Sequence, residues 1–267
     1  MSGDAKKTTA RPGGLPFGLK LRLFLRSLSL QASWNHERMQ NLGLLTVMLP
    51  WVRTQRRNLN QDRIFCRRYY EFFNTNPYLA NFVIGGLVRL EDDRIQAQDL
   101  PPGTTTMFRD SLGRAFASLG DQLFWLGIRP AMAMAICLLG LHGQMLAVIV
   151  LVGIFAIGQL VLRWHSLDRG YDLGFDLVEL LNHRHWHRGI AIAERLGMLL
   201  TGITAGTYLA MLTRPGMPVH DGMLWFGVLA GLGLPIVLRR RLPGEVLILV
   251  GSVLAVLLAF AVLLSGS

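Results

Sequence analysis

The second half of the chain consists of long apolar runs separated by short polar segments. Four stretches contain no charged side chain: 130–162, 196–213, 222–238 and 246–267. A membrane-spanning helix needs about 20 apolar residues, so each of the last three stretches predicts one span. The first stretch is too long for one upright helix, and Gly140-Leu141-His142-Gly143 interrupts it. It therefore predicts a short segment at 131–141 and a full span near 144–162.

The first half has shorter apolar segments. From Leu19 to Leu30, Leu and Phe alternate with Arg22 and Arg26, which lie one helical turn apart. This pattern is typical of a helix that lies in the membrane interface. Three further apolar segments are too short to span a bilayer, and segments of that length are usually re-entrant, interfacial or buried. They are 39–52, 77–90 and 112–126. Short apolar segments interrupted by Gly or Pro indicate broken helices around a transport site.

These patterns predict an all-α integral membrane protein, with transmembrane helices, short re-entrant or broken helices and an N-terminal amphipathic helix. We expect three portions: a disordered cytoplasmic tail at 1–18, an amphipathic and re-entrant helical portion at 19–129, and a transmembrane helical portion at 130–267. The tail carries Lys, Arg, Pro and Gly, and no small-residue cleavage site follows an apolar core. We therefore expect no signal peptide.

Composition supports a membrane protein. Of the 267 residues, 16% are charged and 51% hydrophobic, whereas soluble domains carry about 25% charged residues and disordered chains are poor in apolar ones. Two cysteines, Cys66 and Cys137, are too few for a disulfide framework or a cysteine zinc site. We expect no cofactor.

Charge indicates the partners and the orientation. The net charge is +10, and residues 1–129 hold 18 Lys+Arg against 10 Asp+Glu. Because these basic residues stand beside apolar segments and no nucleic-acid motif accompanies them, we expect them to face the lipid bilayer and not nucleic acid. Loops rich in Lys and Arg stay in the cytoplasm. Loops 163–190 and 239–241 are therefore predicted to be cytoplasmic and loop 214–221 external, with the N-terminus cytoplasmic and the C-terminus outside.

Several motifs occur in a specific order along the chain. They are Phe24-Leu25-Arg26-Ser27, Gln31-Ala32-Ser33-Trp34-Asn35-His36-Glu37-Arg38-Met39-Gln40, Glu71-Phe72-Phe73-Asn74-Thr75-Asn76-Pro77, Gly120-Asp121-Gln122-Leu123-Phe124-Trp125, Arg129-Pro130, and Gly170-Tyr171 with Gly174. In that order and at those separations they resemble the IID membrane subunit of mannose-family (mannose/fructose/sorbose) sugar phosphotransferase systems. The resemblance covers roughly residue 22 to the end.

The resemblance implies a function that composition does not. Family members pair with a IIC subunit to form a hexose permease, and IIA and IIB phosphocarrier proteins phosphorylate the sugar as it enters. It therefore implies a hetero-oligomer in the bacterial inner (plasma) membrane whose IID chain is not an enzyme on its own. Arg114 follows Gly113 where family members usually have Pro. An alternative is a regulatory or receptor-like membrane component of the same fold that does not transport.

A neutral hexose requires polar side chains for its hydroxyls and aromatic rings for its C–H faces. The motifs supply Asn35, Glu37, Asn74 and Asp121 for polar contacts, and Trp34, Phe73 and Trp125 for stacking. An ionisable group at membrane depth is costly and is a candidate functional site by default, so Asp121 is the first candidate.

Structural roles remain open for the same residues. Asp121 could cap a helix or pair with Arg129, and Glu37 could pair with Arg38 or Arg53. Asn74 could cap a helix that starts near Pro77. Trp34 and Phe73 could simply pack.

The histidines at 183, 185 and 187 present another alternative. Histidines at i and i+4 can share a helix face and bind zinc, which would permit a membrane-embedded enzyme. Only Glu179 lies close enough in sequence to complete the set, and Arg184 and Arg188 stand among the histidines. We expect a solvated cytoplasmic loop here, with no metal.

Overall fold

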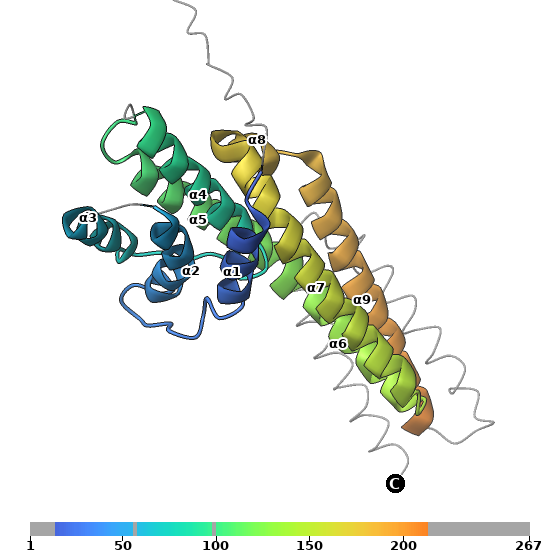
Figure 1. Ribbon diagram of the computed structural model, residues 1–267. Coiled ribbons are helices and arrows are strands. Elements are labelled where there is room, and N and C mark those ends of the chain that lie inside the picture. The colour runs from blue at the N-terminus through green and yellow to red at the C-terminus, as the bar shows by residue number, and fades with distance from the viewer. Residues whose placement is uncertain (1–13, 56–57, 98–99, 213–267) are drawn as a thin grey trace, which may run out of the picture. The chain divides into compact units, whose positions relative to one another are not determined.

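The computed structural model describes residues 14–55, 58–97 and 100–212, and every regular element in that part of the chain is a helix (Figure 1). The spans predicted at 222–238 and 246–267, the arginines at 239–241 and most of the tail at 1–18 lie outside the described residues. The described residues divide into two compact units, one formed by 14–121 with 156–183 and the other by 122–155 with 184–212.

The first unit contains the short helices of the first half. They are α1 (Phe17–Ser27), α2 (Asn41–Thr54), α3 (Leu59–Tyr69), α4 (Ala80–Ala97) and α5 (Thr104–Gly120), and the later part of α7 (Met145–Leu173), η2 (Gly174–Asp176) and α8 (Leu177–Leu181) complete the unit. The helices predicted near 19–30, 39–52 and 77–90 are thereby confirmed as α1, α2 and α4.

An aromatic stack forms one part of the core of this unit. The ring of Phe65 lies between Trp51 on α2 and Tyr69 on its own helix α3, at centroid distances of 5.6 Å and 4.3 Å. Arg68 and the Tyr69 hydroxyl both donate to the buried Glu91 carboxylate on α4, at 2.5 Å and 3.1 Å. Buried charges are stable only when they are paired in this way.

Helices α4 and α7 cross at glycines. A Cβ atom on Gly85 would lie 2.2 Å from the Leu167 carbonyl oxygen, and one on Gly170 would lie 2.2 Å from the Phe82 carbonyl oxygen. Small residues allow helix backbones to approach this closely. The Gly170-Tyr171 motif therefore has a packing role that sequence reasoning did not assign.

The second unit is built on a helix pair. It contains most of η1 (Asp121–Ile128), a π-helical segment, together with α6 (Arg129–Leu141), the start of α7 and α9 (Arg184–Leu212). Helices α6 and α9 run side by side (Figure 1). Gly197 of α9 faces Ala131 of α6, where a Cβ atom would make an ordinary van der Waals contact at 3.7 Å, and Thr204 Oγ1 donates to the Met134 carbonyl at 3.2 Å.

In the part of the chain that the structure describes, two helices are long and apolar enough to cross a membrane: Thr104–Leu141, which joins α5, η1 and α6, and Met145–Leu181. None of the most apolar 18-residue window of the second is buried within the chain. An apolar surface of that size marks contact with lipid or another membrane protein. The predicted break at Gly140 to Gly143 is confirmed, because Gly143 has φ +71° and α7 begins two residues later.

Two predictions about local structure are wrong. The segment 112–126 is not a separate short helix, because Gly120 and Asp121 remain helical and the Asp121 N–H bonds back to the carbonyls of Ala117 and Ser118. The segment 163–190 is not a loop, because α7 continues to Leu173 and α9 begins at Arg184. Its charges belong to a helix that extends past the apolar run and packs on other helices. Asp168 on this helix, for example, pairs with Lys20 on α1.

Candidate functional site

The candidate site lies in the first unit, where the segment 73–76 crosses one face of α5. Gly113 and Gly120 are seven residues apart, which is about two helical turns, so they share a face. A Cβ on Gly120 would lie 2.4 Å from Asn76 Cβ, and one on Gly113 would lie 3.2 Å from the Asn74 carbonyl oxygen. The backbone of α5 can therefore meet this segment only because glycine stands at 120.

Asn76 connects this segment to Asp121. Its buried side chain donates from Nδ2 to Asp121 Oδ1 at 2.9 Å and accepts at Oδ1 from the Tyr78 N–H at 3.0 Å. Asp121 is exposed and begins the π-helical segment, and π-helical turns inside α-helices are frequent at functional sites. The remaining carboxylate oxygen is thus available to a further donor.

Gln40 holds the same segment from the other side. Its N–H donates to the Phe73 carbonyl at 2.8 Å, and its side chain exchanges two hydrogen bonds with the Thr75 backbone, at 2.9 Å and 3.3 Å. Gln40 and Thr75 are both buried. The motifs at 31–40, 71–77 and 120–125 therefore meet at residues 73–76.

The turn at 34–39 carries three of the predicted site residues. Asn35 and Met39 form a backbone bridge, while the Asn35 side chain accepts from the Arg38 N–H at 2.8 Å and donates to Asn41 Oδ1 at 3.1 Å. Trp34 is exposed and meets His36 edge to face, and Glu37 is exposed. Asn35 shapes the turn, while Trp34 and Glu37 project from it.

Phe73 and Asn74 occupy different environments. Phe73 is buried, and its ring packs on Gly113. Asn74 is half-buried and lines a small cavity together with Arg114 and Phe72. Arg114, which follows Gly113, thus lies beside Asn74, a residue predicted to bind the sugar.

Trp125 belongs to the second unit. Its ring is partly exposed, and the Arg129 guanidinium lies 4.1 Å from the ring centroid, a cation–π contact. Within the first unit, Asn76 brings Asp121 to the segment that carries Phe73 and Asn74.

The structure decides some of the alternative roles. Asp121 does not cap the N-terminus of a helix, because the helical backbone continues through it from α5 into η1. Asn76, and not Asn74, bonds the backbone that leads into α4. Arg38 donates to the Tyr70 carbonyl at 3.2 Å and lies over the Tyr70 ring, so its contacts are with Tyr70. The sugar roles of the predicted residues stay predictions.

His185 and His187 lie at the start of α9, and His183 directly precedes that helix. Across residues 14–55, 58–97 and 100–212, no three His, Cys, Asp or Glu side chains gather in a way that could hold a metal ion.

Sequence reasoning missed Gln40, Thr75 and Asn76 as parts of the site. The available signals were the Asn76-Pro77 dipeptide, which is typical of a turn, and the seven-residue spacing of Gly113 and Gly120. Both point to a segment lying against a helix.

Comparison with known proteins identifies the family of this chain. Residues 20–262 match the family described as PTS system mannose/fructose/sorbose family IID component. The mannose-specific EIID component of Escherichia coli (strain K12) is 31% identical over 67% of this chain and 64% of its own length, so the chain spans less than two thirds of that relative.

Solved structures share the fold. A chain described as a membrane protein superposes on this chain with a TM-score of 0.70. A chain of the mannose transporter ManYZ, solved in complex with a microcin, superposes with a TM-score of 0.57. Each is 24% identical in sequence, and each match covers 92% of this chain and 97% of the solved chain. The confirmed fold is thus an all-helical membrane fold. This chain belongs to the mannose/fructose/sorbose family of phosphotransferase-system IID components.

Proposed function

We propose that this chain is the IID subunit of a mannose-family permease and forms, with a IIC subunit, the membrane pathway for hexose uptake. In this proposal IIB, phosphorylated by IIA, phosphorylates the sugar, and the chain performs no chemistry on its own. Membership of the IID family supports it. The carrying observation is the junction at residues 73–76, where three motifs meet and Asn76 binds the Asp121 carboxylate, in a helix long enough to cross the membrane.

The chemistry of the junction suits a neutral sugar. Asp121 has one oxygen bonded by Asn76, which fixes the carboxylate, and a second oxygen that can accept from a sugar hydroxyl. Asn74 and Glu37 supply further polar groups, and Trp34 presents an exposed ring. We propose these residues as sugar or gating contacts, with Asn35 shaping the turn. Trp125, which belongs to the second unit, stays in the proposal as a stacking residue, whereas the ring of Phe73 is buried against Gly113 and packs there.

Hexose uptake tests the proposal. In cells that co-express the chain with IIC, IIB and IIA, Asp121→Asn preserves an acceptor for Asn76 but removes the charge. A hydrogen bond to a charged group is worth about 1.5–3 kcal/mol, so the apparent affinity for hexose should fall roughly 10–150-fold at 1.4 kcal/mol per decade. Asp172→Asn, on an exposed carboxylate of α7, is the matched control. Unchanged affinity in Asp121→Asn would remove Asp121 from the site.

The regulatory alternative has one specific observation in its favour, which is Arg114 beside Asn74. It predicts no uptake by the complete assembly, even with phosphorylated IIB. Arg114→Pro, the usual family residue, should then leave uptake absent.

The orientation is part of the same proposal, with the N-terminus cytoplasmic and the C-terminus outside. A single cysteine at position 267 should react with an impermeant reagent from outside, and one at position 240 should be protected. The reverse labelling pattern would overturn the orientation.

A further inference from the structure

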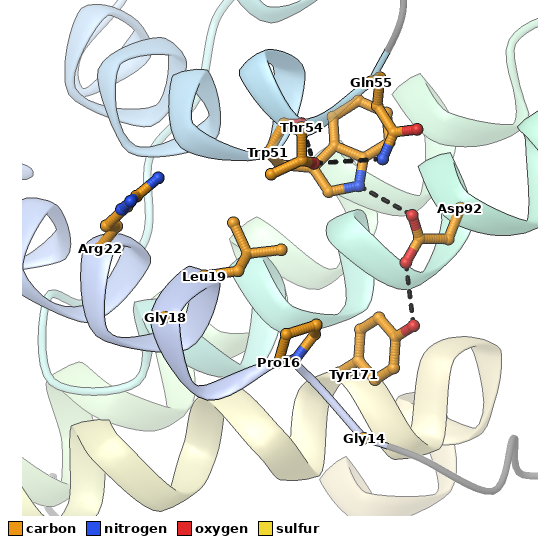
Figure 2. Close-up of a pocket in the computed structure, with 10 residues that line it drawn as sticks. All are labelled: Gly14, Pro16, Gly18, Leu19, Arg22, Trp51, Thr54, Gln55, Asp92 and Tyr171. Atoms are coloured by element: carbon orange, nitrogen blue, oxygen red, sulfur yellow. Dashed lines mark hydrogen bonds between the residues drawn. The ribbon is translucent and has the colours of Figure 1, made fainter.

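A cavity of about 470 Å³ lies in the first unit, apart from the candidate site (Figure 2). It is bounded by the start of α1, the end of α2, Asp92 on α4 and Tyr171 on α7. Its volume falls within the roughly 300–1,000 Å³ that is usual for small-molecule sites. The proposed transport role assigns it no ligand.

One wall of this cavity carries an uncompensated carboxylate. Asp92 accepts from Trp51 Nε1 at 2.8 Å and from the Tyr171 hydroxyl at 2.9 Å, as Figure 2 shows. Both donors are neutral, and within residues 14–55, 58–97 and 100–212 Asp92 has no cationic partner. The carboxylate is thus held in place with its charge unbalanced.

The opposite side of the cavity carries an exposed cation. Arg22 on α1 lines it across from Asp92 (Figure 2). In the described part of the chain, the Arg22 guanidinium forms no hydrogen bond or ion pair. A cavity with a carboxylate on one side and a guanidinium on the other complements a ligand that bears a cation and an anion.

The aromatic residues restrict the type of cation. Trp51 is 0% exposed and Tyr171 6%, so their ring faces are covered and unavailable for stacking on a sugar or a quaternary ammonium group. Recognition at this wall must therefore use hydrogen bonds to the Asp92 oxygens. A primary ammonium can donate them, and a trimethylated one cannot.

A second observation identifies the rest of the ligand. Phe17, Leu21 and Leu25 on α1, with Leu28 directly after it, form an apolar stripe and are 70%, 37%, 54% and 43% exposed. At about 100° per residue, Arg22 lies on the next face of α1, between the stripe and the side that packs on α2.

The position of α1 places that stripe at the membrane border. Phe17 and Phe24 meet Trp164 of α7 edge to face, and Lys20 lies over the same ring. Trp164 follows the end of the apolar run at 144–162, and Trp is enriched at the border of the hydrocarbon layer. The stripe therefore lies at a depth where acyl chains can cover it.

We propose that this cavity binds the headgroup of an ethanolamine phospholipid. The primary ammonium donates to Asp92, the phosphate pairs with Arg22, and the acyl chains cover the stripe on α1. The site differs from a general attraction to anionic lipid, because it requires both charges of the zwitterion.

Native mass spectrometry of the full, delipidated chain in detergent tests this assignment. Phosphatidylethanolamine, phosphatidylcholine and phosphatidylglycerol with identical chains would be titrated in parallel, and glycerophosphoethanolamine tests the headgroup alone. Because one charge-assisted hydrogen-bonded contact is lost, Asp92→Asn and Arg22→Gln should each weaken phosphatidylethanolamine binding roughly 10–100-fold. Asp172→Asn and Arg63→Gln, on exposed residues outside the cavity, should leave it unchanged.

Each outcome of this experiment tests a different part of the proposal. Equal affinity for the ethanolamine and choline lipids would overturn the role of Asp92, and unchanged binding in Arg22→Gln would overturn the phosphate contact. Equal affinity for glycerophosphoethanolamine would overturn the role of the stripe. Arg22 is exposed, so its substitution remains informative even if Asp92→Asn weakens the fold by removing an acceptor from Trp51 and Tyr171.

Discussion

The contact between Gly120 and Asn76 can be tested by adding a single methyl group. In Gly120→Ala, the new Cβ would lie 2.4 Å from both Cβ and Cγ of Asn76, which is far inside van der Waals contact. Asn76 must therefore move, and the hydrogen bond from its Nδ2 to Asp121 breaks. The substitution combines an overlap with the loss of a charge-assisted hydrogen bond.

The magnitude follows from three contributions. Overpacking costs about 1–3 kcal/mol, the lost hydrogen bond about 1.5–3 kcal/mol, and the better helix propensity of Ala returns about 1 kcal/mol. The net destabilisation is therefore roughly 1.5–5 kcal/mol. At about 2–4 °C per kcal/mol for a chain of this size, the melting temperature in detergent should fall measurably.

Gly113→Ala is the matched control, because it makes the same change on the same helix face. Its Cβ would lie 3.2 Å from the nearest atoms, a distance that small shifts can relieve. It should therefore be nearly neutral. A double-mutant cycle adds a second test: Asn76→Ala should cost less in the Gly120→Ala background, where its bond to Asp121 is already broken. Equal melting temperatures for Gly120→Ala and Gly113→Ala would refute the reasoning.

Two further predictions concern the scaffold of the first unit. Gly85→Ala would place a methyl group 2.2 Å from the Leu167 carbonyl oxygen and should destabilise the chain by about 1–3 kcal/mol or more. Its melting temperature should be lower than that of Gly153→Ala, where the space around the glycine is open. Equal melting temperatures would contradict a close crossing of the two helices. Burial, reinforced by the Glu91 carboxylate, raises the pKa of Tyr69 well above its usual value of 10.0. The stabilisation that comes from keeping Tyr69 neutral is then complete below pH 10 and declines as pH rises towards the folded-state pKa. The melting temperature should therefore fall more steeply between pH 9 and 11 in the wild type than in Tyr69→Phe.

The helical membrane fold could be predicted because it rests on local signals. Apolar length identifies candidate spans, and the Gly140 to Gly143 break is visible because glycine readily adopts the positive φ, +71° at Gly143, that is common where a helix ends. The prediction failed at 112–126 for a physical reason. Gly120 resembles a helix breaker in sequence, but in the structure it stays helical and provides space for Asn76 from a distant segment.

The candidate site was predictable in part. Residue chemistry selected Asp121 and Asn74, which do lie on joined segments, because carboxylates and carboxamides are unusual in apolar surroundings. Gln40 was missed because its role depends on pairing with the Thr75 backbone, a contact across 35 residues that no local pattern encodes. The positive charges at 163–190 led to the wrong prediction of a loop. Positive residues indicate which side of the membrane a segment faces, but they do not indicate whether its backbone is helical.

The crossing of α4 and α7 has a consequence for how those helices can move. At each of Gly85 and Gly170, the hydrogen that replaces Cβ points to a carbonyl oxygen of the other helix, those of Leu167 and Phe82. Such Cα–H···O contacts are weak individually, about 0.5–1 kcal/mol each, but here they form a reciprocal pair with no side chain between the two backbones. Because no side chains lie between the two backbones here, the helices cannot shift past one another by changing side-chain rotamers. Helix α4 and the later part of α7 should therefore behave as a single stiff piece, so that a displacement of one carries the other with it.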